Sequence, residues 1–319
     1  MKKHKSILGQ LSADRFLAEY WQKKPLLIRN AIEEFSPPVD GDDLAGLALE
    51  PEVESRLIVG DEWSLEHGPF DEARFTNLPE RNWTLLVQAV NLWVPEVADL
   101  LTYFDFLPPW RIDDIMVSYA EDGGNVGPHF DYYDVFLLQG SGQRRWQIGQ
   151  ACTEKDLRGD LNSLKLLNNF DISDEWVLNP GDMLYLPPQI AHHGVAVGQC
   201  TTFSIGFRAP SATEMLDDLA TELLSRDIAP IHLTDPPLTK AMASQPISTA
   251  YVSRVKKLLQ EILDDEQMLG EWFAQFMSEP KYPPLVYMTE EVRTASLLNN
   301  TPPGTEPTLS HYVNGQKNN

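Results

Sequence analysis

The spacing of apolar side chains divides this sequence into regions of different periodicity. Residues 11–24, 42–49 and 83–104 carry apolar positions three or four residues apart, which predicts amphipathic helices. A short apolar run at 26–28 follows Pro25 and predicts a buried strand. Three helices and one short strand are therefore expected before residue 105.

From about residue 112 to residue 208 the apolar runs become short, and turns rich in Gly and Pro separate them. The pattern predicts strands at 115–119, 134–139, 144–148, 176–178, 183–186, 194–197 and 201–207. The turn chemistry of Gly140-Ser141-Gly142 predicts that the strand after it pairs with the strand before it. So many short strands indicate a barrel or a jelly roll of two sheets.

Helical spacing returns after residue 208, at 215–224 and 252–263, with acidic residues opposite the apolar face. The segment from Pro280 onward is rich in Pro, Thr and Asn, which is typical of a loop or tail. We therefore predict a β-rich domain at 1–208, a helical region at 209–275 and a separate C-terminal segment at 276–319.

The charge balance restricts the kinds of partner. The chain has 25 Lys and Arg against 47 Asp and Glu, a formal net charge of −22. Such a field repels phosphate backbones, so we expect no direct nucleic-acid binding and instead an attraction for basic proteins. The alternative is that the acidity serves solubility alone.

Cys152 and Cys200 form no Cys-x-x-Cys motif, which excludes a disulfide scaffold and a thiolate zinc site and fits a reducing compartment. No signal peptide or membrane-spanning run is expected, so we predict a soluble, cytoplasmic protein.

The candidate chemistry centres on Gly127-Pro128-His129-Phe130-Asp131. In an extended segment, residues i and i+2 point to the same face, so His129 and Asp131 can reach one ion. A third ligand is available in the segment that runs from Gly181 to His192 and His193. Neighbouring strand residues point to opposite faces, so only one of these two can bind, and we choose His192. Two His and one carboxylate leave three positions open, which iron(II) needs for a bidentate co-substrate and dioxygen.

Arg144 is the candidate for binding that co-substrate. Strand alternation places it on the same face as Trp146 and Ile148, which are expected in the core, whereas Arg145 is expected in solvent. A buried Arg needs a carboxylate partner, and the distal carboxylate of 2-oxoglutarate is suitable. The alternative is an internal salt bridge to a protein acid.

With these motifs the sequence resembles the JmjC-type ribosomal oxygenases and, within them, the bacterial ribosomal-protein arginine hydroxylases. The matching stretches are 20–29, 83–88, 127–146, 181–192 and 204–210. The resemblance implies an α+β fold: a double-stranded β-helix of the cupin or jelly-roll type with N-terminal helices, then a helical dimerisation region. The winged helix that usually follows is expected to be truncated or absent.

The resemblance also implies roles for individual residues. Iron(II) would be bound by His129, Asp131 and His192, and 2-oxoglutarate by Arg144 and by Ser118 on the strand before the His-x-Asp motif. No further catalytic residue is expected, and dioxygen is the second co-substrate.

Bacterial members of this family hydroxylate the β-carbon of an arginine in a large-subunit ribosomal protein. Relatives in higher organisms act on a histidine instead. We therefore expect a basic ribosomal protein as substrate and a homodimer formed through the helices after residue 210. Asp122, Tyr132 and Tyr133 are candidates to bind a guanidinium by charge pairing and cation–π contact, although either Tyr could serve packing alone.

Two competing functions are a non-catalytic, dimeric binding module for basic proteins and a zinc hydrolase with the same three ligands. The hydrolase is the weaker of these, because the sequence offers no obvious general base beside the ligands and Arg144 is then unexplained.

Overall fold

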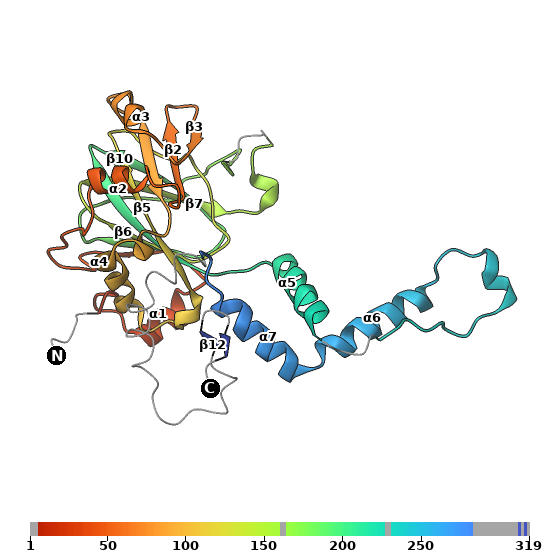
Figure 1. Cartoon of the computed structure of the whole chain (residues 1–319). Helices are drawn as coiled ribbons and strands as arrows, with labels where there is room; N and C mark the ends of the chain where they lie inside the picture. Colours follow the sequence, from red (N-terminus) through yellow and green to blue (C-terminus); the bar gives the residue numbers. More distant parts are fainter. Residues whose placement is uncertain (1–5, 160–163, 227–230, 283–311, 314–315, 318–319) are drawn as a thin grey trace. The chain divides into compact units, whose positions relative to one another are not determined.

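A computed structural model of the chain describes residues 6–159, 164–226, 231–282, 312–313 and 316–317 (Figure 1). The chain divides into two compact units, the first of which contains the residues up to Ala209 and the second the residues from Pro210 to Met288. The first unit holds all the β-structure between residues 26 and 207 and every candidate site residue.

In the first unit, eleven strands of the described residues form two antiparallel sheets. The larger sheet has the order β1-β9-β6-β11-β5-β4-β2-β3, and the smaller sheet has the order β10-β7-β8. The strands are β1 Leu26–Ile28, β2 Ser55–Val59, β3 Ser64–His67, β4 Trp83–Val87, β5 Ile112–Ala120, β6 Val135–Gln139, β7 Gln143–Ala151, β8 Asp174–Leu178, β9 Met183–Leu186, β10 Ile190–Val197 and β11 Cys200–Phe207. The helices are α1 Ala13–Glu19, α2 Gly41–Leu47, α3 Glu72–Thr76 and α4 Pro95–Ala98, with 3-10 turns η1 Val90–Leu92, η2 Asp99–Phe104, η3 Pro109–Arg111 and η4 Glu154–Asp156.

The two sheets enclose one apolar core, and the N-terminal helices cover the outer face of the larger sheet. Between the sheets, Val135, Leu137, Leu184 and Leu186 of the larger sheet pack with Trp146, Ile148 and Leu178 of the smaller sheet. On the outer face, alternate residues of the same strands pack against α1, α2 and α4, and this larger cluster includes Phe16, Leu44, Val97, Phe136, Tyr185 and Phe203. The predicted α+β jelly roll with N-terminal helices is confirmed.

The prediction of one helix over 83–104 is wrong for its first part. Trp83–Val87 is strand β4, which lies between β2 and β5 in the larger sheet. Four of its five residues are buried, so both faces of the strand are apolar. A short run that is apolar on both faces does not show the alternation that identifies a strand. Strands β2 and β3 were not predicted.

The predicted hairpin around Gly140-Ser141-Gly142 is also wrong, although both of its strands exist. β6 pairs with β11 and β9 in the larger sheet, whereas β7 pairs with β10 and β8 in the smaller sheet. The turn therefore carries the chain from one sheet to the other. Gly142 has a positive φ of 60°, and a Cβ there would overlap the carbonyl of Gln199. Local turn chemistry does not determine which strand becomes the neighbour.

The second unit is helical in its described residues. It contains α5 Ala212–Ser225, η5 Lys240–Ser244, α6 Thr249–Leu263, α7 Glu266–Ser278 and the short strands β12 Tyr312–Val313 and β13 Gln316–Lys317. Leu219 of α5 packs with Met268 and Trp272 of α7, and Trp272 Nε1 donates to Asp218 at 2.7 Å. The expected helices at 215–224 and 252–263 are present, and α7 was not predicted.

Most of the segment 276–319, where a winged-helix remnant or a tail was expected, lies outside the described residues. Among the helices that the structure does describe, none is long and apolar enough to cross a membrane.

Candidate metal centre

Two chain segments that are far apart in the sequence lie side by side at the candidate site. The His129 N–H donates to the His192 carbonyl at 3.1 Å, and the His192 N–H donates to the His129 carbonyl at 2.8 Å. One step along the same pairing, the Gln189 N–H donates to the Asp131 carbonyl at 2.7 Å. The segment that carries His129 and Asp131 is not a regular strand, but these backbone bonds hold it in extended form beside β10.

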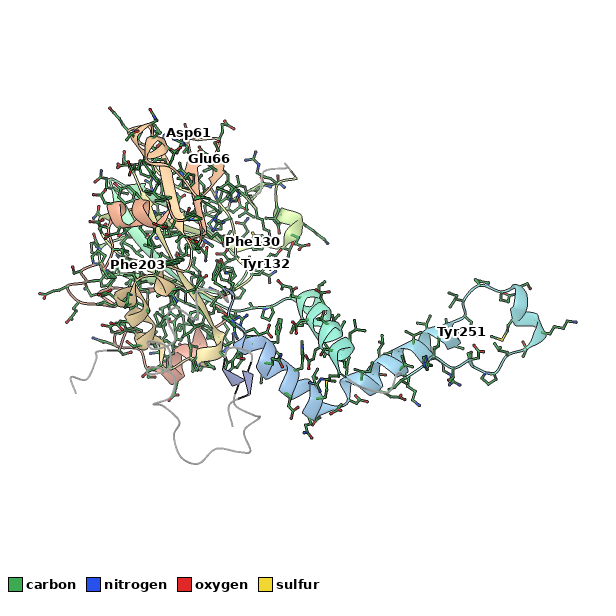
Figure 2. All side chains as sticks on the ribbon, in the orientation of Figure 1. Asp61, Glu66, Phe130, Tyr132, Phe203 and Tyr251 are labelled. Atoms are coloured by element: carbon green, nitrogen blue, oxygen red, sulfur yellow. The ribbon has the colours of Figure 1, made fainter. Side chains whose placement is uncertain are left out.

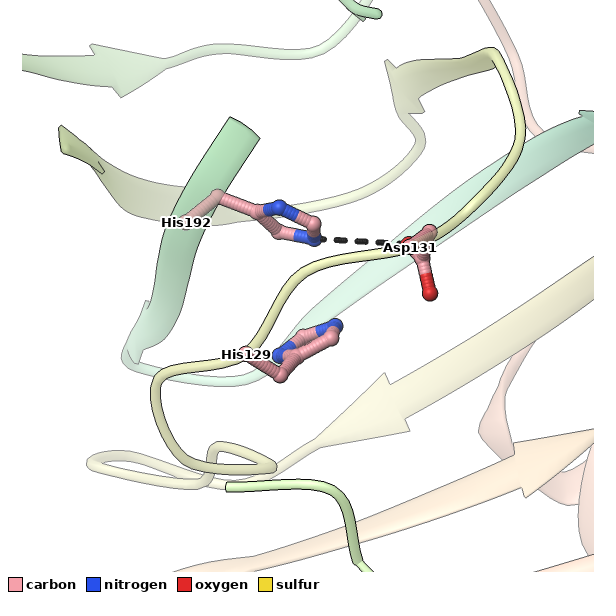
Figure 3. A group of neighbouring side chains, drawn as sticks. All are labelled: His129, Asp131 and His192. Carbon is pink, nitrogen blue, oxygen red and sulfur yellow. Dashed lines mark ion pairs between the residues drawn. The ribbon is translucent and has the colours of Figure 1, made fainter. Parts of the chain in front are cut away.

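The side chains of this pairing converge on one point (Figure 3). One ligand atom each from His129, Asp131 and His192 lies within 4.8 Å of the others, and His192 Nε2 is 3.6 Å from Asp131 Oδ2. The two imidazole rings have centroids 4.3 Å apart. Three donor atoms so close together fit the coordination of a single metal ion.

Backbone carbonyls fix the orientation of both imidazoles. Nδ1 of His129 lies 2.9 Å from the Gly127 carbonyl, and Nδ1 of His192 lies 2.9 Å from the Ile190 carbonyl. Since a carbonyl oxygen can only accept, each Nδ1 carries the proton, and each Nε2 keeps a free lone pair. This is the tautomer that a metal-binding His needs.

Burial keeps His192 in its neutral form. Its side chain is buried, and desolvation, followed by the neighbouring His129, lowers the pKa of His192 to about 4. A neutral imidazole binds a metal without first releasing a proton. Two imidazole nitrogens and one carboxylate match the facial set of non-haem iron(II) sites, which leaves three positions for other ligands.

His193, the other candidate for the third position, points away from this group. Its Nε2 lies 3.1 Å from Asn125 Oδ1, and its Nδ1 lies 3.3 Å from Gln147 Oε1. Asn125 Oδ1 also accepts from Trp63 Nε1 at 2.7 Å and from the Gly127 N–H at 2.9 Å. Asn125 therefore connects the loop before His129 to two other parts of the barrel. In the sequence it was only one residue of a predicted loop, and the single local signal is an Asn two residues before Gly127.

Arg144 lies deeper in the barrel and has no ion pair with a carboxylate of the described residues. Its side chain is buried, its Nη2 is 3.6 Å from Cys200 Sγ, and its Nε has no hydrogen-bond partner in the described part of the chain. An internal salt bridge, the alternative weighed for this residue, is therefore not found. A buried guanidinium without an anion is costly, so this arrangement suits an incoming carboxylate.

Several of the residues near Arg144 are small or hydroxylated. Ala120, Ala196 and Cys200 form one buried cluster, and Ala196 is the cross-strand partner of Arg144. Ser118 is buried on β5 two residues before Ala120, on the same face of the strand, with its Oγ 3.5 Å from the Thr202 carbonyl. Arg145, as expected, is exposed.

Of the three predicted substrate contacts, two directly follow Asp131 in the chain and the third, Asp122, is held by other partners. Tyr132 and Tyr133 directly follow Asp131 and are 37% and 41% exposed. Figure 2 labels Tyr132 beside Phe130, and the two rings pack edge-on with centroids 5.2 Å apart. The nearby Asp131 carboxylate is the main cause that raises the pKa of Tyr133. Asp122 instead accepts from the Gly198 N–H at 2.9 Å and pairs with Arg81 at 3.1 Å, so the structure does not bring its carboxylate to the triad.

Comparisons with known proteins agree with this geometry. The JmjC domain family matches residues 99–215. The ribosomal protein uL16 3-hydroxylase of Escherichia coli is 36% identical over 84% of this chain and 71% of its own length. A probable ribosomal oxygenase of Haemophilus influenzae is 38% identical over 80% of this chain and 64% of its own length.

Among solved structures, the Escherichia coli ribosomal oxygenase YcfD in complex with cobalt and 2-oxoglutarate superposes with a TM-score of 0.76 at 35% identity. The superposition covers 85% of this chain and 72% of that one. The fold, the matched domain and the identity over most of both chains lead to one conclusion. This chain belongs to the JmjC-domain ribosomal oxygenases.

Proposed function

We propose that this chain is an iron(II)- and 2-oxoglutarate-dependent hydroxylase that acts on the β-carbon of an arginine in a large-subunit ribosomal protein. The observation that carries the proposal is the convergence of His129, Asp131 and His192, with both Nδ1 atoms held by carbonyls, together with a buried Arg144 that pairs with no carboxylate of the described residues. The substrate class is supported by the Escherichia coli relative, which is named as a 3-hydroxylase of ribosomal protein uL16.

In this proposal His129, Asp131 and His192 hold the metal, and the carbonyls of Gly127 and Ile190 keep the two rings in the binding tautomer. When bound, iron(II), 2-oxoglutarate and dioxygen supply the chemistry: one oxygen atom enters a substrate C–H bond, the other enters succinate, and carbon dioxide leaves. The protein orients the reactants and excludes water.

Arg144 is assigned to the distal carboxylate of 2-oxoglutarate, because its guanidinium can offer two parallel hydrogen bonds to it. Ser118 is the second proposed contact, since its hydroxyl lies in the same part of the barrel interior as the Ala120, Ala196 and Cys200 cluster. Its long contact to Thr202, at 3.5 Å, leaves the hydroxyl free to turn toward a better acceptor.

The exposed rings of Tyr132 and Tyr133, which directly follow Asp131, can hold a substrate guanidinium through cation–π contact. The Tyr132 ring already has one cation above it, since Lys165 Nζ lies 5.4 Å from its centroid. The net charge of −22 attracts a basic ribosomal protein and disfavours direct binding of nucleic acid. Such a substrate places the activity in the cytoplasm.

The decisive experiment incubates the full chain with iron(II), 2-oxoglutarate and purified large-subunit ribosomal proteins. We expect a mass increase of one oxygen atom, located by fragmentation on an arginine, with release of succinate. His129→Ala should abolish the increase. Oxygen found on a histidine would establish the histidine-directed alternative. Binding of ribosomal proteins without turnover, unchanged in His129→Ala, would establish the non-catalytic binding module and refute the proposal.

The second unit supports a proposed homodimer. No residue of α6 is buried, and Val252, Val255, Leu259 and Leu263 recur on one face of this helix with exposures from 42% to 62%. Such an apolar stripe is expected to pack against a second copy. Leu259→Glu should give a monomer in sedimentation experiments, while Lys257→Ser on the opposite face should remain dimeric. A dimer that persists in Leu259→Glu would exclude this helix as the interface.

A further inference from the structure

Strand β7 carries two buried side-chain donors, Arg144 Nε and Trp146 Nε1, that no group of the described residues satisfies. Arg144 Nε and Trp146 Nε1 are both inaccessible to solvent, and neither has a hydrogen-bond partner in the described part of the chain. Buried N–H groups without an acceptor are rare because their desolvation is not compensated. Arg144 is already assigned to the co-substrate, whereas Trp146 has no assigned role.

The Trp146 ring lies near both the metal ligand His192 and the buried Arg144. Its ring centroid lies 6.0 Å from that of His192, which faces the metal position. The Arg144 guanidinium carbon lies 5.8 Å from the centroid of the Trp146 ring. Trp146 is 5% exposed and faces the barrel interior, as Arg144 does. The indole therefore borders the path that a molecule must take from the metal to the guanidinium.

Gly194 determines which edge of the indole faces that path. It is the cross-strand partner of Trp146 on β10, and a Cβ at this position would lie 2.6 to 2.9 Å from Cζ3, Cη2 and Cε3 of the ring. These three atoms belong to the benzene half of the indole. The pyrrole half with Nε1 is therefore turned away from Gly194. Any side chain larger than glycine would displace the ring.

We propose that the Trp146 Nε1–H donates a hydrogen bond to a carboxylate oxygen of bound 2-oxoglutarate, as a second fixed donor beside Arg144. The inference rests on the proposed function, since it requires 2-oxoglutarate to lie between the triad and Arg144. An indole N–H is a donor only, so it cannot compete for the protons of Arg144. A hydrogen bond from a neutral donor to an ionised acceptor is stronger than one between neutral groups.

The test measures binding directly and does not depend on turnover. Equilibrium dialysis of labelled 2-oxoglutarate is performed with the full chain loaded with manganese(II), and manganese affinity is measured separately. Trp146→Phe, which keeps an aromatic ring but removes the N–H, should weaken 2-oxoglutarate binding by about tenfold or more and leave manganese affinity unchanged. Trp176→Phe is the matched control, because Trp176 is the β8 partner of Trp146 and packs on the same apolar cluster.

A second variant keeps the N–H but moves it. Gly194→Ala should displace the indole and also weaken 2-oxoglutarate binding, so it replaces Trp146→Phe if that variant does not fold. Equal binding by wild type and by the folded variant would overturn the inference alone and assign Nε1 to a buried water. A wild-type protein that binds manganese but no 2-oxoglutarate would overturn the proposed function and, with it, this inference.

Discussion

The side-chain amide of Asn125 offers a way to loosen the metal centre without changing a ligand. Its Oδ1 accepts from Trp63 Nε1 at 2.7 Å and from the Gly127 N–H at 2.9 Å, and it lies 3.1 Å from His193 Nε2. Gly127 in turn supplies the carbonyl that accepts from His129 Nδ1. Asn125→Ala removes the acceptor of two N–H donors and should release the segment that orients His129.

The size of the effect follows from three bonds, the two that Oδ1 accepts and the one that Nδ2 donates to the Gly123 carbonyl. A hydrogen bond contributes about 1 kcal/mol net, so their loss should lower the free energy of unfolding by about 3 kcal/mol, or less where water replaces the amide. Mutation of a group that orients a metal ligand typically weakens metal binding by roughly 10–100-fold. We therefore expect Asn125→Ala to bind manganese(II) or iron(II) about tenfold or more weakly, while the chain still folds.

Two measurements separate these effects. Metal affinity is obtained by equilibrium dialysis, and the free energy of unfolding of the metal-free protein by urea titration. Asn125→Asp is the matched control, because it keeps the accepting oxygen while it replaces the Nδ2 donor, 2.9 Å from the Gly123 carbonyl, by a charged carboxylate oxygen. The expected order of metal affinity is wild type, Asn125→Asp, then Asn125→Ala. Wild-type metal affinity in an Asn125→Ala protein of reduced stability would refute the idea that this amide positions His129.

Three further outcomes test other parts of the structure. Asp131→Asn removes the charged ligand and should weaken metal binding by more than about 100-fold with little change in the unfolding midpoint, as dialysis and thermal unfolding would measure. Burial lowers the pKa values of His192 and His193 from 6.5 to about 4. As the pH falls, both imidazoles are therefore protonated in the unfolded chain before they are protonated in the folded protein. The free energy of unfolding of the metal-free protein should therefore fall between about pH 6.5 and pH 4, and His193→Gln should reduce that slope in urea titrations at several pH values. Tyr185→Phe removes a 2.6 Å hydrogen bond to the buried Asp134 and should lower the free energy of unfolding by about 1.5–3 kcal/mol, whereas an unchanged urea midpoint would contradict it.

The sequence predicted most of the barrel because its strands are short, apolar and separated by turns. The expected strands at 115–119, 183–186 and 201–207 correspond to β5, β9 and β11 within a few residues. The convergence of His129, Asp131 and His192 could also be anticipated, since both motifs are local and extended. That these side chains bind iron remains a prediction, which the metal-binding experiments test.

What the sequence could not supply was the pairing of strands. Trp83–Val87 has apolar residues on both faces, so its pattern did not distinguish a strand from a buried helix. The turn at Gly140–Gly142 gave no sign that its two strands enter different sheets. The role of Asn125 was hidden for a related reason, because its partners Trp63 and His193 are distant in the sequence and near only in the fold.

The pairing of β7 with β10 explains why the proposed co-substrate site lies where it does. Three successive inward-facing pairs of this ladder are His192 with Ile148, Gly194 with Trp146 and Ala196 with Arg144. Each of the last two pairs sets a large side chain opposite a very small residue, so the indole and the guanidinium have space to extend into the barrel. A shift of one residue would turn His192 outward and bring His193 inward, because strand neighbours face opposite sides. The register of one strand pair thus sets both which histidine faces Asp131 and how far the guanidinium lies from it.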